Sequence, residues 1–216
     1  MKGLQFNLYS NEKNIVNLVV DKLNRYGGSN KELIQKQNEL FHLLCFLDLD
    51  NNLSLNDYIQ PNEPGDFLMK KDEKNILFEV TECFGNNNSY MYINNQLNFL
   101  FGRVKRITSN YSFSIEEAKD KIKKLIQNKN LKNYNDNNEY DEVILLIVTG
   151  EYSGCSSTGN WIIKYLDSCD ITESIYKVYV LDYYASGKDS SPIIIKEVSS
   201  EIENLKGFFK NFRNCD

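Results

Sequence analysis

The sequence predicts an α/β protein in which a mixed central β-sheet is flanked by helices on both faces. Capped amphipathic segments in the first half predict helices, and residues 66–82 predict two strands joined by a charged turn. A strand–helix–strand unit over residues 142–182 favours parallel pairing with a right-handed crossover. With 216 residues and 41% hydrophobic residues, the chain is long enough for one well-filled domain.

This single domain, residues 1–216, divides into three parts. Residues 1–28 are expected to form an N-terminal helical extension, residues 29–150 the core, and residues 151–216 a C-terminal extension of strands and helices. No internal repeat, heptad array or proline-rich linker separates the parts, so one domain is the simplest account.

Caps and glycine stops mark the first two helices. Ser10 is followed by apolar residues at helical spacing, and the pattern stops at Gly27-Gly28, which predicts a first helix. Ser29 and Glu32 form a capping box that opens a second helix. Leucines at helical spacing carry this helix to about Leu47 and give it a core face.

Further helices are expected later in the chain. Residues 96–108 are expected to be helical, and a capping box at Ser114-Ile-Glu-Glu117 opens the next helix. A shorter helix is expected over residues 160–168. Ser191-Pro192 favours a last helix with proline at its first position, although the β-branched run Ile193-Ile-Ile195 makes a strand the rival interpretation.

The strands of the second half are the clearest ones. Residues 142–149 are apolar on both faces, as expected for a central strand that helices cover. Residues 176–182 form the next strand, and the hairpin over residues 66–82 comes before both. A mixed sheet follows from this order of elements.

Composition excludes several classes of function. The five cysteines are widely spaced without a Cys-x-x-Cys, which argues against a disulfide framework and a zinc site. The single histidine, His42, excludes any mechanism that needs a histidine pair. The longest apolar run, Val143 to Val148, has the length of a buried strand, so no membrane contact is expected. The first residues lack a signal-peptide pattern, so a cytoplasmic location is expected.

Two acidic residues of the hairpin are the candidate functional residues. Asp66 would open the first strand and Glu79 would lie late in the second. A carboxylate on an apolar strand is costly unless it is paired or bound to a metal, and two together suit Mg²⁺. The alternatives are that Asp66 is a turn residue after Pro64-Gly65 and that Glu79 is an exposed strand residue. Glu82 is either an exposed surface residue or a third metal ligand.

These residues resemble a known family. The stretches Pro64-Gly-Asp66 and Ile76-Leu-Phe-Glu79-Val-Thr81, with the order of elements from about Asn30 to Gly150, resemble the PD-(D/E)XK nuclease superfamily. The resemblance implies a restriction-endonuclease-like core and metal-dependent hydrolysis of DNA by an endonuclease, with a role in restriction or host defence. It implies a Mg²⁺ or Mn²⁺ site made by Asp66, Glu79, the carbonyl of Val80 and Glu39.

The chain departs from the family where a lysine is usual, because Thr81 stands there. The resemblance therefore gives the positioning of water, or contact with the phosphate, to Thr81, Gln96 or Lys105. Gln96 and Arg103 are expected to share one helix face. Contacts with duplex DNA are expected from the basic residues Arg103, Lys105, Arg106, Lys119 and Lys123, for which a solvated helix face is the alternative. A homodimer is expected for double-strand cleavage.

Two other functions stay open. The missing lysine fits a catalytically inactive nuclease-like binding or interaction protein. A nucleotide- or anion-sensing domain could instead use the loop from Gly150 to Gly159, which follows a buried strand and precedes a predicted helix. This loop lacks the Gly-Lys-Ser/Thr of a phosphate-binding P-loop, so NTP hydrolysis is not expected.

Overall fold

A computed structural model describes residues 12–49, 58–83, 94–95, 97–104, 115–132, 134, 139–149, 175, 177–182 and 193–194. Its helices are α1 (Glu12–Lys22), α2 (Asn30–Leu49) and α4 (Ile115–Asn130). Its strands are β1 (Tyr58–Pro61), β2 (Phe67–Lys71), β3 (Lys74–Glu82), β4 (Glu142–Thr149), β5 (Lys177–Asp182) and β6 (Ile193–Ile194). None of the helices in these ranges has the length and apolar character needed to cross a bilayer.

The strands form one six-stranded sheet in the order β1-β2-β3-β4-β5-β6. Strands β1, β2 and β3 are antiparallel, whereas β3, β4 and β5 are parallel and β6 is antiparallel to β5. The predicted hairpin, the mixed sheet and the parallel pairing after residue 142 are therefore confirmed. Strand β1 was not predicted, because its four residues end in a proline and show no clear alternation.

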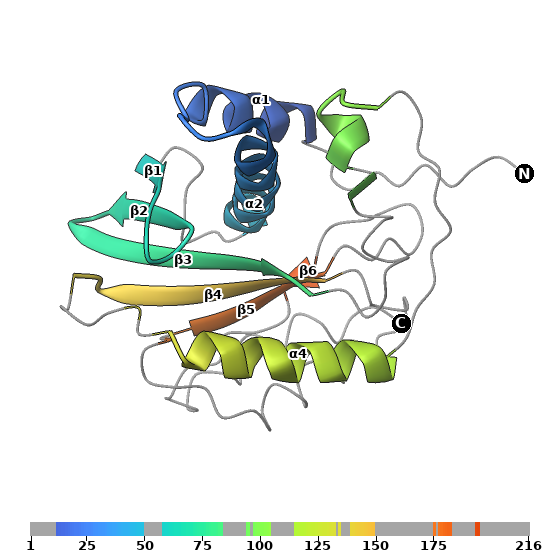
Figure 1. Ribbon diagram of the computed structural model, residues 1–216. Helices are drawn as coiled ribbons and strands as arrows, with labels where there is room; N and C mark the ends of the chain where they lie inside the picture. The colour runs from blue at the N-terminus through green and yellow to red at the C-terminus, as the bar shows by residue number, and fades with distance from the viewer. Residues whose placement is uncertain are drawn as a thin grey trace, which may run out of the picture.

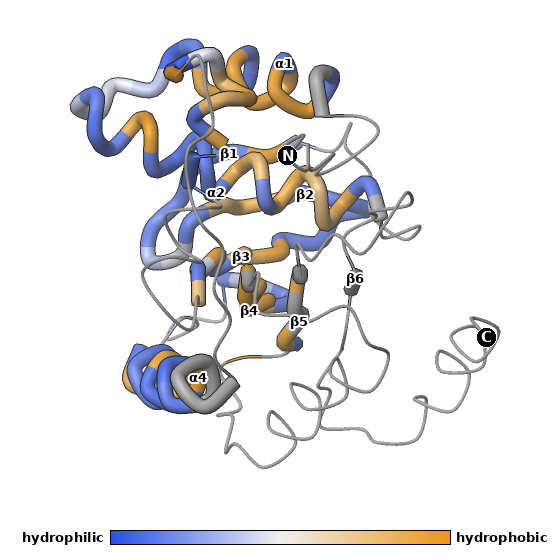
Figure 2. Tube along the Cα trace, turned by 90° about the vertical axis from the view of Figure 1, so that its right-hand side faces the viewer, coloured by the Kyte–Doolittle hydropathy of each residue, from blue (hydrophilic) through white to orange (hydrophobic). Residues whose placement is uncertain are grey.

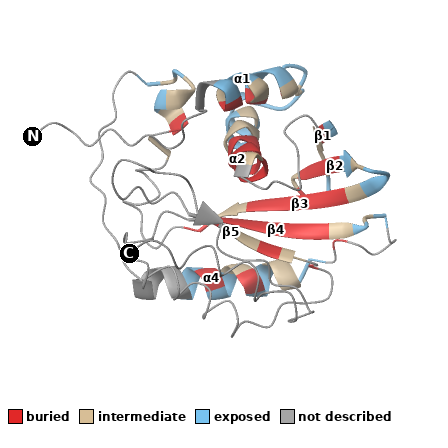
Figure 3. Ribbon diagram, turned by 180° about the vertical axis from the view of Figure 1, so that it is seen from behind, coloured by how far each residue is buried: buried red, intermediate tan, exposed pale blue. Residues whose placement is uncertain are grey.

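Helices cover both faces of the sheet, as predicted (Figure 1). Helices α1 and α2 lie on one face and α4 lies on the other. The apolar strands and α2 form the middle of the molecule, while α4, seen nearly along its axis, is mostly hydrophilic (Figure 2). Burial is concentrated on α2, β3 and β4 (Figure 3). Two hydrophobic clusters follow from this layering, one containing α1 and α2 and one containing α4.

The capping box at the start of α2 is confirmed. The Ser29 backbone N donates to Glu32 Oε2 at 2.7 Å, and the Ser29 hydroxyl donates to the same oxygen at 2.8 Å. The hydrogen bonds from the side chain and backbone of Ser29 lower the pKa of the Glu32 carboxyl. Glu32 is therefore a capping residue, as expected, and does not point into the sheet.

The predicted helix over residues 96–108 is wrong in its length. Within the described residues the helix ends at Leu100, because Gly102 adopts φ 66° and turns the chain out of the helix. The Arg103 N–H donates to the Asn98 carbonyl at 2.7 Å, and the Gly102 N–H donates to the Phe99 carbonyl at 3.0 Å. These two bonds are those of a Schellman motif, which satisfies the last carbonyls of a helix. Arg103 therefore lies beyond the helix and does not continue its face.

The last predicted helix is also wrong. Ile193–Ile194 is strand β6, paired with Leu181 and Asp182 of β5. The β-branched residues favour the strand, which was the rival interpretation, over the helix that Ser191-Pro192 suggests. The helix expected over residues 160–168 and the loop from Gly150 to Gly159 lie outside the described residues.

The hairpin that holds the acidic residues depends on local backbone geometry. Asp72 and Glu73 link β2 to β3 with φ values of 47° and 67°, which is the geometry of a type I′ turn. Before β2, Gly65 is buried against β3. A Cβ at Gly65 would lie 2.7 Å from Leu77 Cδ1 and 3.0 Å from the Phe78 carbonyl oxygen. Glycine therefore lets the chain approach β3 closely just before Asp66.

Replacing Gly65 with alanine is expected to lower the free energy of unfolding by about 1–3 kcal/mol, because the added methyl group overpacks the contact with β3. Urea denaturation would measure the change. Gly27→Ala is the control, since a Cβ there meets nothing within 4 Å, and it should not lower stability. Equal stability of Gly65→Ala and the unchanged protein would contradict the close approach.

Candidate active site

Asp66 is fixed beside the backbone of β3. Its N–H donates to the Phe78 carbonyl at 2.9 Å, and its Oδ2 accepts the Val80 N–H at 2.9 Å. These two bonds flank Glu79, so the Asp66 carboxylate lies next to the strand segment that carries Glu79. Asp66 is thus more than a turn residue, because its side chain reaches across the hairpin.

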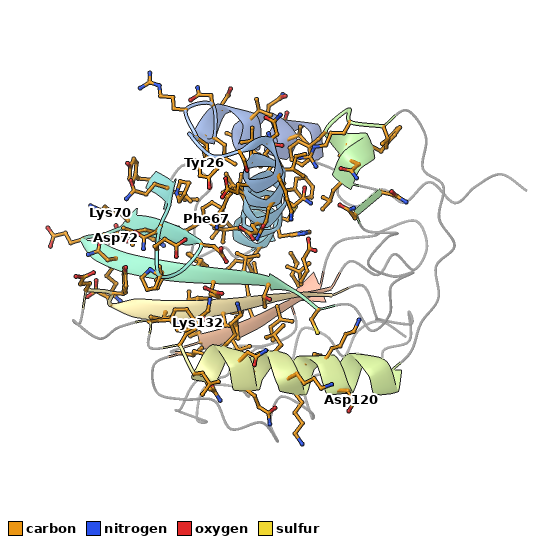
Figure 4. The ribbon with its side chains drawn as sticks, in the orientation of Figure 1. Tyr26, Phe67, Lys70, Asp72, Asp120 and Lys132 are labelled. Carbon is orange, nitrogen blue, oxygen red and sulfur yellow. The ribbon has the colours of Figure 1, made fainter. Side chains whose placement is uncertain are left out.

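A lysine from α2 completes the surroundings of Asp66. The Lys36 ammonium donates to Asp66 Oδ1 at 2.6 Å, and it lies 2.9 Å from Glu39 Oε2 on the same helix. It also lies 5.3 Å from the centre of the Phe67 ring, on the α2 side of the sheet (Figure 4). Burial lowers the pKa of Lys36, but the hydrogen bond and charge of Asp66, and then those of Glu39, outweigh it and raise the pKa. Lys36 therefore stays protonated.

Glu39 points inward from α2 and is 9% exposed. Gln35 donates to Glu39 Oε1 at 2.8 Å, and Oε2 lies 2.9 Å from the Lys36 ammonium. Burial, and then the negative charge of Asp66, raise the pKa of the Glu39 carboxyl, against the opposing effects of Lys36 and Gln35. The ionised form of Glu39 is consequently disfavoured in the folded chain.

Replacing Glu39 with glutamine is expected to raise the melting temperature at pH 7 by about 2–4 °C, or roughly 1 kcal/mol. The pKa of Glu39 is higher in the folded state than in the unfolded state, so at a pH between these two pKa values the folded state binds more protons. The stability that the Glu39 carboxyl contributes is therefore lost as the pH rises from the unfolded-state pKa through the folded-state pKa. Melting curves in metal-free buffer should show the two proteins converge below pH 4.5, the ordinary pKa of a glutamate. A constant difference from pH 4 to 8 would contradict the prediction.

Glu79 is buried on the other face of the sheet. It is 4% exposed and shares its face with Leu77, which packs in the cluster of α4. Its Oε1 accepts hydrogen bonds from Lys129, at the end of α4, and from Lys132 at 3.1 Å. Side chains alternate along β3, so that Glu79 shares a buried face with Leu77, and the alternative of an exposed strand residue is wrong. The carboxylate is paired, which is what its burial requires.

Tyr134 is a buried tyrosine beside Glu79. Its side chain is 2% exposed. Burial, then the negative charges of Glu79 and Asp66, and then a hydrogen bond with Glu79, raise the pKa of the Tyr134 hydroxyl well above its usual range. The Lys132 ammonium lies 5.7 Å from the centre of the Tyr134 ring. In Figure 4 Lys132 lies on the α4 side of the sheet, opposite Phe67.

Arg103 faces α2. It donates to Asn38 Oδ1 and Asn98 Oδ1, both at 3.1 Å, and to Gln37 Oε1 at 2.5 Å. Its guanidinium carbon lies 4.5 Å from the centre of the Phe101 ring. Burial lowers the pKa of Arg103. Three neutral amide oxygens thus hold this charge in place, and two of the five N–H groups of Arg103 have no acceptor among the described residues.

Glu82, the possible third ligand, interacts with the single histidine. His42 is fully buried on α2, and its Nε2 lies 3.1 Å from Glu82 Oε1. The Glu82 side chain is 26% exposed, so it is neither plain surface nor free to join the other acids. Thr81, between Glu79 and Glu82, is half-buried.

Several predicted residues are not brought into the site. Lys123 is exposed on α4, and Lys119 lies on α4 without a described side chain. Gln96, Lys105 and Arg106 lie outside the described residues, so the roles given to them stay predictions. The lysines that do contact the carboxylates were missed, because they come from α2 and from the end of α4 rather than from β3.

The described side chains can offer a cation two carboxylates of the hairpin. In the ranges that the structure describes, no group of three or more His, Cys, Asp or Glu lies close enough to hold a metal ion. Mg²⁺ nevertheless uses as few as one or two protein carboxylates, with water and phosphate oxygens as its other ligands. The donor set thus fits Mg²⁺ better than zinc.

Comparison with known proteins adds little to this geometry. No family model matches the chain, and no curated protein matches it. A search of solved structures found Pyrococcus furiosus SfsA in complex with Ca²⁺, with 14% sequence identity and a TM-score of 0.27. The match covers 80% of this chain and 65% of that one, so the chain spans less than two thirds of the matched protein. A likeness this weak carries no argument about function.

Proposed function

We propose that this chain is a metal-dependent nuclease of the PD-(D/E)XK type that hydrolyses phosphodiester bonds of DNA. The observation that carries the proposal is the juxtaposition of Asp66 and Glu79. The Asp66 carboxylate is bonded to the Val80 N–H, directly after Glu79, and Glu79 is a buried carboxylate. A glutamate is rarely buried unless it is paired, as Glu79 is with Lys129 and Lys132, and buried charges of this kind are frequent at functional sites. The mixed sheet, with β4 parallel to β3, also supports the proposal.

Lysines from other elements supply the charge that Thr81 lacks. Lys129 and Lys132 reach Glu79, and Lys36 reaches Asp66. Because its raised pKa keeps Lys36 protonated, it is a poor proton acceptor and suits the stabilisation of negative charge on a phosphate. The missing lysine of the hairpin therefore does not by itself make the site inactive.

A Mg²⁺ or Mn²⁺ ion would be held by Asp66 and Glu79, with the Val80 carbonyl as a further oxygen ligand. Glu39 would join them only after moving, because no three acids among the described residues lie close enough to hold a metal ion. When bound, such an ion lowers the pKa of a coordinated water and neutralises charge on the phosphate. The chain's own residues orient this site: the Val80 N–H holds the Asp66 carboxylate, and Gln35 holds Glu39. Lys36, Lys129 and Lys132 compete with the ion for the same oxygens, so the metal must displace them.

Duplex DNA would contact the basic residues around the site. Arg103 has two N–H groups that meet no acceptor in the part of the chain that the structure describes, and Lys123 is exposed on α4. Contacts by Lys105, Arg106 and Lys119, and water or phosphate contacts by Thr81 and Gln96, belong to the same proposal. A homodimer for double-strand cleavage and a role in restriction or host defence rest on analogy with the family.

The test is cleavage of duplex and single-stranded DNA by the purified chain with Mg²⁺, with Mn²⁺, and with a chelator. The proposal predicts cleavage that needs the metal, together with Mn²⁺ binding measured by calorimetry in the absence of DNA. Mn²⁺ binding without cleavage would limit the chain to a nuclease-like binding protein. Neither cleavage nor Mn²⁺ binding would contradict the proposal and favour the inactive or the anion-sensing alternative.

A further inference from the structure

Arg103 carries a positive charge that no carboxylate among the described residues balances. Its three acceptors are the side-chain oxygens of Gln37, Asn38 and Asn98, which are all neutral amides. The chain contains 30 Asp and Glu residues, so a carboxylate could have held an arginine whose role is only structural. Burial lowers the pKa of Arg103, which shows that water solvates its charge incompletely. The guanidinium is therefore fixed in place without being neutralised.

The hydrogen bonds of Arg103 leave one edge of the guanidinium without an acceptor among the described residues. Nη1 donates to Asn38 and Asn98, and Nη2 donates to Gln37. The Nε–H and the second N–H of Nη2 remain, and they lie side by side on the planar group. The Phe101 ring covers one flat face, and the side chain of Arg103 is half-buried, so solvent still reaches part of it. Two such parallel donors match two oxygens of one phosphate.

This edge of Arg103 is separate from the acidic residues of the proposed metal site. Lys36 contacts Asp66 on the side of α2 that faces the sheet. Asn38 follows Lys36 by two residues, which places it about 160° round the helix from Lys36. Helix α2 therefore lies between a ligand of Arg103 and Asp66, and binding at Arg103 needs no metal ion.

We propose that Arg103 binds a phosphate group through its Nε–H and its second Nη2–H, with the three amides as positioning groups. Amide oxygens suit this role because they orient the guanidinium and leave its charge available to a ligand. A protein carboxylate in the same place would orient it equally well but would neutralise it. The phosphate can belong to a DNA strand or to a free phosphate compound, since both present the same pair of oxygens.

The test adds one carboxylate to this cluster. Asn38→Asp keeps the shape of the side chain and its acceptor oxygen, and it gives Arg103 an internal anion. Asn17→Asp is the control, because Asn17 is exposed within α1 and its replacement changes the net charge by the same amount. Calorimetry in the presence of a chelator measures the binding of inorganic phosphate, of acetate and of a short DNA duplex. Asn38→Asp should bind phosphate or DNA about tenfold or more weakly than Asn17→Asp does.

The melting temperature separates this role from a structural one. Asn38→Asp adds an ion pair between Arg103 and α2, so its melting temperature should stay the same or rise while its affinity falls. A purely structural Arg103 would give the same melting temperature with unchanged affinity. If Asn38→Asp lowers the melting temperature, Asn98→Asp replaces it, because it presents the same carboxylate to Nη1 from another element.

The three ligands identify the source of the phosphate. Weaker binding of the duplex alone supports a site for a DNA strand, and weaker binding of inorganic phosphate supports a site for a free phosphate compound. Equal affinities of the aspartate variant and its control would overturn the inference. Failure of the unchanged chain to bind phosphate or DNA, or acetate bound as tightly as phosphate, would overturn it as well. Each of these results is obtained without metal, so none depends on whether the chain cleaves DNA.

Discussion

Glu79→Gln should reduce metal-dependent cleavage of DNA about a thousand-fold or more, because a carboxylate ligand of the metal contributes several kcal/mol to the transition state. Glutamine keeps the size of the side chain on β3 and removes its charge. The same variant should lose measurable Mn²⁺ binding. Both losses have one physical cause, which is that a neutral amide oxygen attracts a divalent cation far less than a carboxylate does.

The control for this variant is Glu142→Gln. Glu142 lies on the neighbouring strand β4 and pairs with Lys74 and Lys177. Its replacement by glutamine therefore removes the same charge from a carboxylate that is also paired with lysines. Circular dichroism spectra should show that both variants keep the fold. Cleavage by Glu79→Gln at the rate of Glu142→Gln would remove Glu79 from the mechanism and with it the proposed metal site.

The double variant Lys129→Met/Lys132→Met should lower the free energy of unfolding by about 3–5 kcal/mol. Glu79 is 4% exposed, so loss of both lysines leaves a buried carboxylate without a positively charged partner among the described side chains. Lys132→Met alone should cost less than about 1 kcal/mol, because the Lys132 side chain is 49% exposed and water screens its charge. Urea denaturation at pH 7 measures both changes.

Glu79→Gln should largely restore the stability of this double variant, since the buried charge is then gone together with its partners. A pair of exposed lysines on the same helix, Lys123 and Lys124, provides the control, and their replacement by methionine should change stability by no more than about 0.5 kcal/mol. If Glu79→Gln fails to restore the double variant, the lysines stabilise α4 by packing and not by pairing with Glu79.

The sequence predicts the strand faces well and the contacts across the fold poorly. Alternation along β3 places Glu79 with Leu77 and opposite Phe78, and the structure confirms it. Whether that face is buried depends on α4, and the lysines that pair with Glu79 lie at the far end of α4 and beyond it. No local pattern connects those positions, so the choice between a paired and an exposed glutamate could not be made in advance.

Two further misses have the same origin. Lys36 lies in a polar stretch of α2 and contacts Asp66 only because the helix crosses β2 at that point. Tyr134 lies in an asparagine-rich segment that predicts a loop, and a loop is expected at the surface rather than 2% exposed. The predicted helix over residues 96–108 is too long for a local reason, because Gly102 takes the left-handed conformation that ends a helix, which glycine adopts readily.

The chain contains a single histidine, so its imidazole NMR signals can be identified without labelling individual sites. His42 is that imidazole, and its Nε2 lies 3.1 Å from Glu82, which shares strand β3 with Glu79. The histidine ring resonances in a proton–nitrogen NMR spectrum therefore belong to one known residue, His42, whose partner Glu82 lies on the same strand as Glu79. Titration with a divalent cation or with phosphate would shift these resonances if the ligand perturbs β3, whether or not the protein cleaves DNA.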